Sequence, residues 1–256
     1  MKKFTSLILI LTLVIMAFAG CESKPKESPA SDFKYEINDG KVTITRYIGK
    51  DADVVIPAQI DGKPVAELRW MRGDSDAEES VLKTVVIPDS VKTVSASCFN
   101  NCKKLESVKF GTGLKTIHER AFSNCTSLVR VELPEGLTFL GNRAFEKCTS
   151  LQYVSIPSTL TGWHGEEFIE CSSLTNVVFA EGIETIGNTY SFASASALKN
   201  IVIPASVKRI SDYAFADCKS LERVTFEGNE PIIGDHTFYD SDRLEIYIYH
   251  KSTASG

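Results

Sequence analysis

A phrase of 23 residues recurs through most of this 256-residue chain. The stretch FNNCKKL, which begins at Phe99, returns as FSNCTSL from Phe122. Phenylalanines then continue at the same interval, apart from one step of 24 residues, and form a column: Phe99, Phe122, Phe145, Phe168, Phe192, Phe215 and Phe238. A fixed period of about 20–50 residues is typical of a solenoid, in which each coil is one supersecondary unit.

The other columns of the repeat predict its local structure. The consensus reads L-x-x-V-x-I-P-x-x-L-x-x-I-x-x-x-A-F-x-x-C. Val-x-Ile alternates with period two, so we predict a short strand with both apolar side chains inward, which the proline then ends. A second apolar pair, such as Leu137 and Leu140, allows another short extended segment, and Ala144 to Cys148 could hold one helical turn. Stacked coils should pair their strands in parallel and pile like residues on like.

This pattern resembles the BspA-like, or treponemal-type, leucine-rich repeat class, from about Leu82 to Tyr249 and more weakly from Val54. The resemblance implies a right-handed leucine-rich-repeat solenoid of short parallel strands, turns and short helical turns. It also implies a bacterial surface or secreted protein of a kind linked with adhesion to matrix proteins, cells or other bacteria. The family pattern contains no catalytic residues. The chain departs from the pattern at four column positions: Trp163, Glu167, Ala195 and Ser241.

Residues 1–20 have the features of a signal peptide: a positive Lys2-Lys3 pair, an apolar segment and small residues before a cut site. Cys21 follows directly, and the junction resembles a bacterial lipobox, which implies a lipid on Cys21 and an extracytoplasmic protein at the cell membrane or outer surface. A plain secretory signal followed by an incidental cysteine is the alternative. Residues 21–32 are polar with two prolines, so we expect a lipidated, disordered tether.

The ends of a solenoid expose apolar cross-sections that need caps. Asn38-Asp39-Gly40 lies between two alternating runs, so residues 33–80 are predicted to hold a β-hairpin cap and an irregular first coil. The solenoid itself should span residues 81–256. No well-formed cap follows Tyr249: either Tyr247 and Tyr249 shield the last coil, or the chain is a shortened relative.

The residues that could carry chemistry favour structural roles. Apart from Cys21 there are six cysteines, most of them one per coil. Neighbours in such a column should lie about 4.8 Å apart with parallel side chains, which favours buried free thiols over disulfides or a metal site. The histidines lack triad partners, although Glu166 and Glu167 beside His164 could hold a metal in principle. We therefore expect no catalysis, cofactor, metal or small-molecule substrate, and the net charge of −5 argues against nucleic acid.

The outward positions beside Val-x-Ile should line one continuous face, the kind of surface with which solenoids bind partners. Its centre is low in charge and includes one tyrosine, as interface cores often do. The alternative, equally open, is a sheet surface whose valines serve strand propensity. The candidate binding residues are Tyr153, Ser155, Asn176, Val178, Asn200, Val202 and Arg223.

Two functions follow from these expectations. The first is a non-catalytic cell-envelope lipoprotein whose solenoid binds a protein ligand and whose lipid on Cys21 holds it at the membrane. The second is an envelope scaffold that spaces or assembles other components. In that case the open last coil could pair edge to edge.

Overall fold

The computed structural model describes residues 26–71, 80–241 and 243–248. The predicted signal peptide, Cys21 and most of the charged segment after Trp70 lie outside the described residues. Within the part of the chain that is described, no helix is long and apolar enough to cross a membrane.

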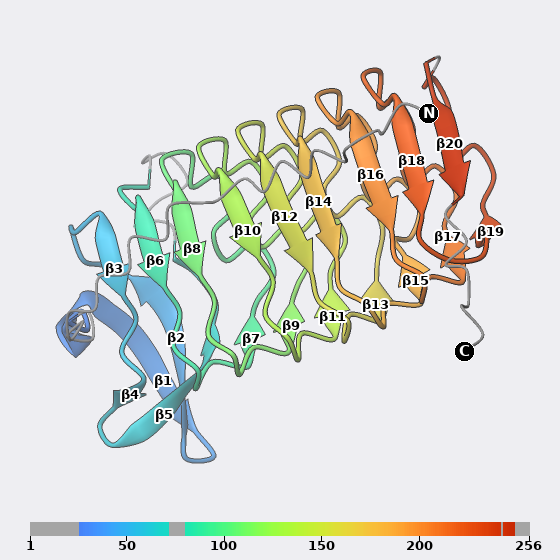
Figure 1. The fold of residues 1–256 in the computed structure, drawn as a ribbon. Helices are drawn as coiled ribbons and strands as arrows, with labels where there is room; N and C mark the ends of the chain where they lie inside the picture. The colour runs from blue at the N-terminus through green and yellow to red at the C-terminus, as the bar shows by residue number, and fades with distance from the viewer. Residues whose placement is uncertain (1–25, 72–79, 242, 249–256) are drawn as a thin grey trace, which may run out of the picture.

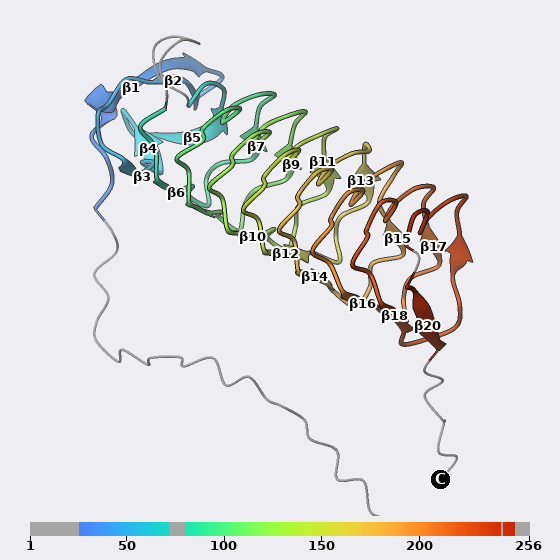
Figure 2. The ribbon, with the colours of Figure 1, turned by 90° about the horizontal axis from the view of Figure 1, so that it is seen from above.

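Two rows of parallel strands run along the solenoid (Figures 1 and 2). The row of longer strands comprises β3 (Asp53–Val55), β6 (Thr84–Val86), β8 (Ser107–Lys109), β10 (Arg130–Glu132), β12 (Tyr153–Ile156), β14 (Asn176–Phe179), β16 (Asn200–Ile203), β18 (Arg223–Phe226) and β20 (Glu245–Ile248). The row of two-residue strands comprises β7 (Thr93–Val94), β9 (Thr116–Ile117), β11 (Phe139–Leu140), β13 (Gly162–Trp163), β15 (Thr185–Ile186), β17 (Arg209–Ile210) and β19 (Ile232–Ile233). Both predicted extended segments are therefore confirmed.

The strand register follows the repeat. Tyr153 lies beside Asn176 and Val154 beside Val177, 23 residues further along the chain. Within β12 the side chains alternate as predicted, because Val154 and the last residue, Ile156, are buried while the other two are half-buried. Pro157 follows β12 directly, and its carbonyl accepts the N–H of Leu160 at 3.3 Å, which closes a turn between the two rows.

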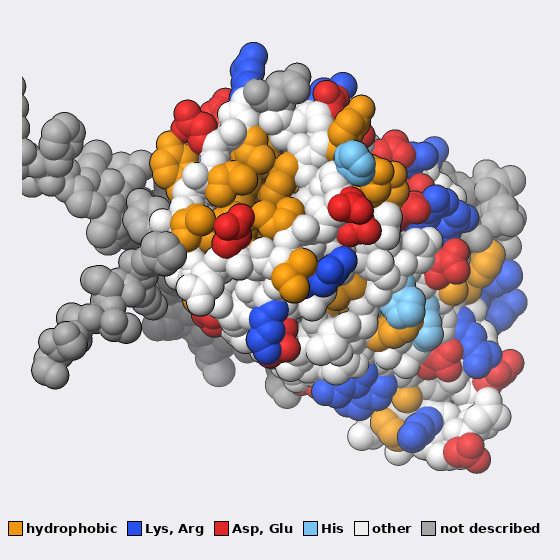
Figure 3. Space-filling view, turned by 90° about the vertical axis from the view of Figure 1, so that its right-hand side faces the viewer, with side chains coloured by type: hydrophobic (Ala, Val, Ile, Leu, Met, Phe, Trp, Pro, Cys, Tyr) orange, Lys and Arg blue, Asp and Glu red, His pale blue; other side chains and the backbone are white. Residues whose placement is uncertain are grey.

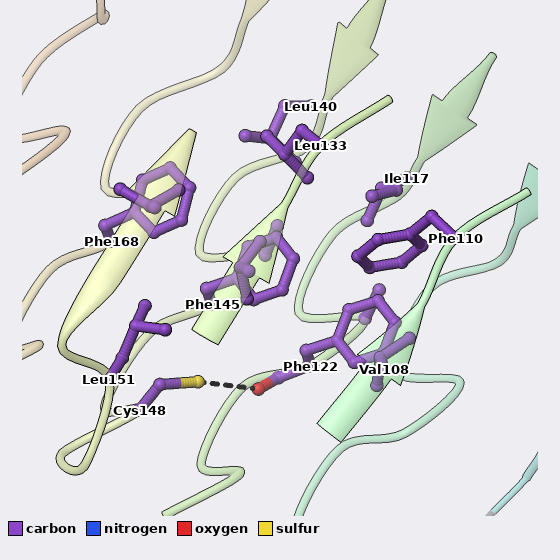
Figure 4. Packing of buried hydrophobic residues seen from close by; sticks show 14 of the residues in the cluster. Val108, Phe110, Ile117, Phe122, Leu133, Leu140, Phe145, Cys148, Leu151 and Phe168 are labelled. Atoms are coloured by element: carbon purple, nitrogen blue, oxygen red, sulfur yellow. Dashed lines mark hydrogen bonds between the residues drawn. The ribbon is translucent and has the colours of Figure 1, made fainter. Parts of the chain in front are cut away.

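The phenylalanine column is confirmed as one continuous stack. From Phe99 to Phe238, successive ring centroids lie 4.8–5.8 Å apart with interplanar angles of 3–11°. Figure 4 shows Phe122, Phe145 and Phe168 superposed, with leucine and isoleucine side chains packed beside them. Most of these rings have no exposed surface, so the column is the centre of the core.

The segment between Ala and Cys is not a helical turn, which corrects that part of the prediction. It is a run of turns in which the residue before Ala121 and the residue before Cys125 have positive φ, 52° at Arg120 and 60° at Asn124. These left-handed residues stop the backbone from continuing as a helix. They also turn N–H groups toward the next coil, as where Phe122 donates to the carbonyl of Ala144 at 2.7 Å.

The cysteine column consists of free thiols, as predicted. All six cysteines in the described residues are buried, and none of them forms a disulfide with another. Cys148 Sγ donates to the backbone carbonyl of Phe122 at 3.3 Å, and Cys125 and Cys171 make the same contact one coil away (Figure 4). Burial raises the pKa of Cys125 and Cys171 well above the ordinary thiol value, so both stay protonated at neutral pH.

The N-terminal end is closed by the predicted hairpin, β1 (Phe33–Asn38) and β2 (Lys41–Tyr47). Asp39 and Gly40 have φ of 50° and 72°, which a two-residue primed turn requires. The irregular first coil adds β4 (Gln59–Ile60) and β5 (Lys63–Leu68). Strand β5 pairs in parallel with β2 and with β7, so the hairpin extends the row of short strands.

The folded part begins before the predicted boundary at Phe33. The Ser28 N–H donates to the carbonyl of Val55 at 2.8 Å, and the Val55 N–H returns to Ser28 Oγ at 3.2 Å. The Ala58 N–H reaches a carboxylate oxygen of Glu27, and the short 3-10 helix η1 (Ala30–Asp32) leads into β1. These residues therefore cover the outer edge of β3 and are not a free tether.

Both rows lose their strand pairing at the 24-residue coil. Strands β13 and β15 do not pair, nor do β14 and β16, so each row divides into two sheets. The turn segments stay connected, because Phe168 N–H donates to the carbonyl of Ser191 at 2.8 Å and the Phe168 and Phe192 rings remain 5.2 Å apart. The core stack therefore continues across this coil although both strand ladders stop.

Candidate protein-binding face

The outward positions of the longer strands lie in two rows that cross the sheet. Tyr153 is beside Asn176, and Ser155 is beside Val178. After the break, Asn200 is beside Arg223. Val202 completes the second row beside Thr225. The structure therefore brings all seven predicted residues to one side of the molecule, which we call the sheet face.

The centre of the sheet face is exposed and uncharged. Val178 and Val202 are 42% and 46% exposed, which places them among the most exposed aliphatic side chains of the described residues. Asn176 and Asn200 are also exposed, and each offers amide donors and acceptors. This combination of apolar contact area and uncharged hydrogen-bonding groups suits the centre of a protein interface.

Cation–π pairs, which the sequence reasoning missed, flank this centre. The Arg130 guanidinium carbon lies 3.6 Å from the Tyr153 ring centroid, and Arg130 also pairs with Glu132 at 2.6 Å. On the other side the Arg223 guanidinium lies 4.9 Å from the ring of Tyr247. The register of the repeat could have revealed both pairs, because an arginine in each case precedes a tyrosine by about one coil.

The repeat alone predicts one continuous face, but the structure divides it between two sheets. Strand β14 carries Asn176 and Val178, and β16, which does not pair with β14, carries Asn200 and Val202. The sheet break therefore passes through the middle of the candidate surface. The neighbouring end of the face has a hollow of about 330 Å³ between β8 and β10, lined by Ser107, Val108, Lys109, Phe110, Arg130 and Glu132.

A buried polar cluster interrupts the alanine column at Glu167, one of the departures from the repeat pattern named above. The Glu167 side chain has no exposed surface, and its carboxylate accepts the N–H groups of His164 and Gly165 at 2.5 and 2.6 Å. Ser191 Oγ donates to the other carboxylate oxygen at 2.6 Å. A Cβ on Gly187 would lie 2.6 Å from Ser191 Oγ, so the inserted coil needs glycine there.

This cluster is a structural feature of the core. Burial raises the pKa of Glu167, and no part of the side chain reaches solvent where a substrate could meet it. Glu166 does not join it, because that carboxylate pairs with the Arg143 guanidinium at 2.5 Å. Across the described ranges, no three His, Cys, Asp or Glu side chains lie close enough together to hold a metal ion.

Comparison with solved structures finds similar solenoids. The chain is similar to a leucine-rich repeat protein of T. pallidum at 29% identity and a TM-score of 0.61, over 86% of this chain and 91% of the other. It is also similar to a leucine-rich repeat protein of Bacteroides ovatus at 22% identity and a TM-score of 0.45, over 87% and 71% of the two chains. A search of curated protein sequences finds no match.

The family comparison agrees with the repeat read from the sequence. The BspA type Leucine rich repeat region matches in six copies over residues 77–194 and 188–255. Repeats of this kind are in general non-catalytic. With its stacked columns, parallel strands and matching repeats, this chain belongs to the BspA-type leucine-rich repeat family.

Proposed function

We propose that this protein is a non-catalytic lipoprotein of the cell envelope that binds a protein ligand on its sheet face. The observation that carries the proposal is the exposed, uncharged centre around Val178 and Val202, bordered by Arg223 on one side and Arg130 on the other. Aromatic and arginine side chains around a low-charge centre are the composition of interface hot spots.

A rigid scaffold supports this function. The side chains beneath the face, including Val154, Val177 and Val224, are buried in the core and fixed by the columns. A preorganised surface loses little conformational entropy when it binds, so modest contacts can give useful affinity. The predicted lipid on Cys21 would hold this surface outside the cytoplasm.

The test is capture by the immobilised chain, from Glu22 onward, of proteins from the bacterial surface and of extracellular-matrix proteins. We expect the double variant Val178→Lys and Val202→Lys to lose about tenfold or more of the captured ligand, because two buried lysines would be left at the interface centre. Ile37→Lys makes the same change at a site of similar exposure on the distant hairpin and should capture normally. Equal capture by both variants would contradict the proposal that the sheet face binds the ligand.

The anchor and the location are tested separately. Growth with labelled palmitate should label the wild-type chain, whereas Cys21→Ser should carry no label. Protease treatment of intact cells should remove the solenoid if it is displayed on the surface. Absence of lipid on the wild-type chain would overturn the lipoprotein part of the proposal. It would not affect the proposed binding face, which the capture experiment tests.

A second candidate function, an envelope scaffold, is favoured by one observation. The last coil leaves apolar side chains such as Ile232 and Tyr239 exposed at the end of the solenoid. Recovery of envelope proteins instead of host or matrix proteins in the capture experiment would favour this function.

A further inference from the structure

The two ends of the solenoid differ in how their strand edges are covered. At the N-terminal end, Ser28 bonds to the edge of β3 and the β1–β2 hairpin extends the other row. At the C-terminal end, β19 and β20 each pair with one neighbour, and no other strand of the described residues lies beyond them. Free β-edges of this kind are ready templates for pairing with another chain.

The open end is also apolar. Ile232 is 66% exposed, Tyr239 58%, Ile246 49% and Ile248 41%. Figure 3 looks onto this end of the molecule and shows hydrophobic side chains gathered on it. Ile246 and Ile248 lie beside the buried residues Val224 and Phe226, so they continue core columns that no further described coil covers.

The area of this end matches that of a dimer interface. These four side chains leave roughly 300–500 Å² of apolar surface, taking about 150–250 Å² for a large side chain. A standard interface buries about 800 Å² on each partner, of which somewhat more than half is apolar, or about 450 Å². The end of one solenoid therefore offers about the apolar area that a stable dimer needs.

We propose that two copies of this chain associate through their C-terminal ends about a two-fold axis. At the N-terminal end Ser28 covers the edge of β3, whereas at the C-terminal end the outer edge of β20 has no partner among the described residues and is flanked by exposed isoleucines, so this end of one copy can pair with the same end of another. A two-fold axis perpendicular to the sheet pairs β20 with its copy in antiparallel fashion.

The sequence of β20 is self-complementary in that pairing. With the axis at Tyr247, Ile246 lies opposite Ile248 of the second copy, and the two isoleucine pairs join the cores. Tyr247 lies opposite its own copy on the outward side, next to Thr225 of β18. The contact closes after two copies, because an isologous interface uses the same surface on each partner.

The experiment is sedimentation equilibrium on the chain from Glu22 onward, without lipid, at about 1–100 μM. We expect the mass of a dimer at the upper concentrations. Ile246→Lys should give a monomer, because it buries an unpaired charge in the joined core. Val178→Lys, the same kind of change on the sheet face, should remain dimeric. A wild-type chain that stays monomeric throughout would overturn the proposal.

Cross-linking tests the axis directly and does not depend on a destabilising variant. Tyr247→Cys places two cysteines opposite each other at a spacing that a disulfide accepts, so oxidation should give a covalent dimer. Asn200→Cys, also exposed but on β16, two strands away from β20, should not cross-link. A dimer that is unaffected by Ile246→Lys, or in which Cys at position 247 does not cross-link, would contradict the assigned end.

Discussion

The regular coils and the 24-residue coil are held to their neighbours by different interactions. Between Phe99 and Phe168 every coil continues the strand ladders, the aromatic stack and a column of small side chains. Between Phe168 and Phe192 the stack persists at 5.2 Å, but both ladders stop and a buried carboxylate replaces alanine.

This difference shows that the solenoid continues where strand pairing is absent, provided that the ring stack is kept. Backbone pairing stops at this coil in both rows, between β13 and β15 and between β14 and β16, whereas the aromatic stack continues across it. Ring stacking tolerates the insertion because the extra residue lies in the turn before the ring. The hydrogen bond from Ser191 to Glu167 connects the two coils where the ladders do not, and the N–H groups of His164 and Gly165 hold the carboxylate within its own coil.

The largest expected effect comes from the aromatic stack. Phe145→Ala in the regular part should lower the free energy of unfolding by about 3–5 kcal/mol, because it leaves a cavity between two rings. Phe168→Ala, beside the break, should cost about the same if the stack is truly continuous. Urea unfolding measures both. A cost at Phe168 of less than half that at Phe145 would mean that the column is weakened at the break.

The next effect comes from the buried carboxylate. Glu167→Ala restores the repeat consensus, yet it should destabilise the protein by about 1–3 kcal/mol because it leaves the N–H groups of His164 and Gly165 without their acceptor and removes the contact from Ser191. If Glu167→Ala alone is as stable as the wild type in urea, the polar cluster does not hold the coils together.

A smaller effect should appear in the pH dependence. Because burial raises the pKa of Glu167, the folded protein holds this proton more tightly than the unfolded chain. The resulting stabilisation is complete below the ordinary carboxyl pKa and is lost as pH rises through the raised value. Glu167→Gln should therefore gain stability over wild type as pH increases from 4 to 8. A difference between the two that stays constant across this range would show that the pKa is not raised.

The smallest expected effect concerns the left-handed turn residues. Asn124 in a regular coil and Ser194 in the 24-residue coil occupy the same position, with φ of 60° and 61°. Asparagine tolerates this conformation better than serine, so Ser194→Asn should add about 0.5 kcal/mol. Ser172→Asn, at an exposed position without positive φ, is the matched control. Equal shifts in thermal midpoint for the two would remove the conformational explanation.

The comparison also shows what the sequence could predict. The strands, the stacked Phe122 and Phe145, and the free thiol of Cys148 followed from the constant period, because equal spacing places like residues in one column. The pattern noted Glu167 as a departure, and the column places Ser191 beside it because both residues precede a stacked phenylalanine. The contacts of Glu167 with the N–H groups of His164 and Gly165 could not be predicted, because they depend on the local course of the turn. The left-handed turns were missed because residues such as Arg120 carry no glycine signal.

The same limit applies to the candidate face. Its residues follow from strand alternation, whereas the break between β14 and β16, beneath Val178 and Val202, has no counterpart in that alternation. The covering of β3 by Glu27 and Ser28 was not foreseen either, because a polar segment with prolines has no periodic signal. Such contacts depend on where an irregular segment runs along the edge of a strand, and the repeat pattern does not predict that path.

The most direct test of the central claim is photo-crosslinking from the sheet face. A photoreactive amino acid at position 178 should cross-link the captured ligand, since Val178 lies at the exposed centre of that face. The same group at position 116, in the row of short strands, should give no cross-link. A ligand that is captured but cross-links from position 116 and not from 178 would contradict recognition by the sheet face.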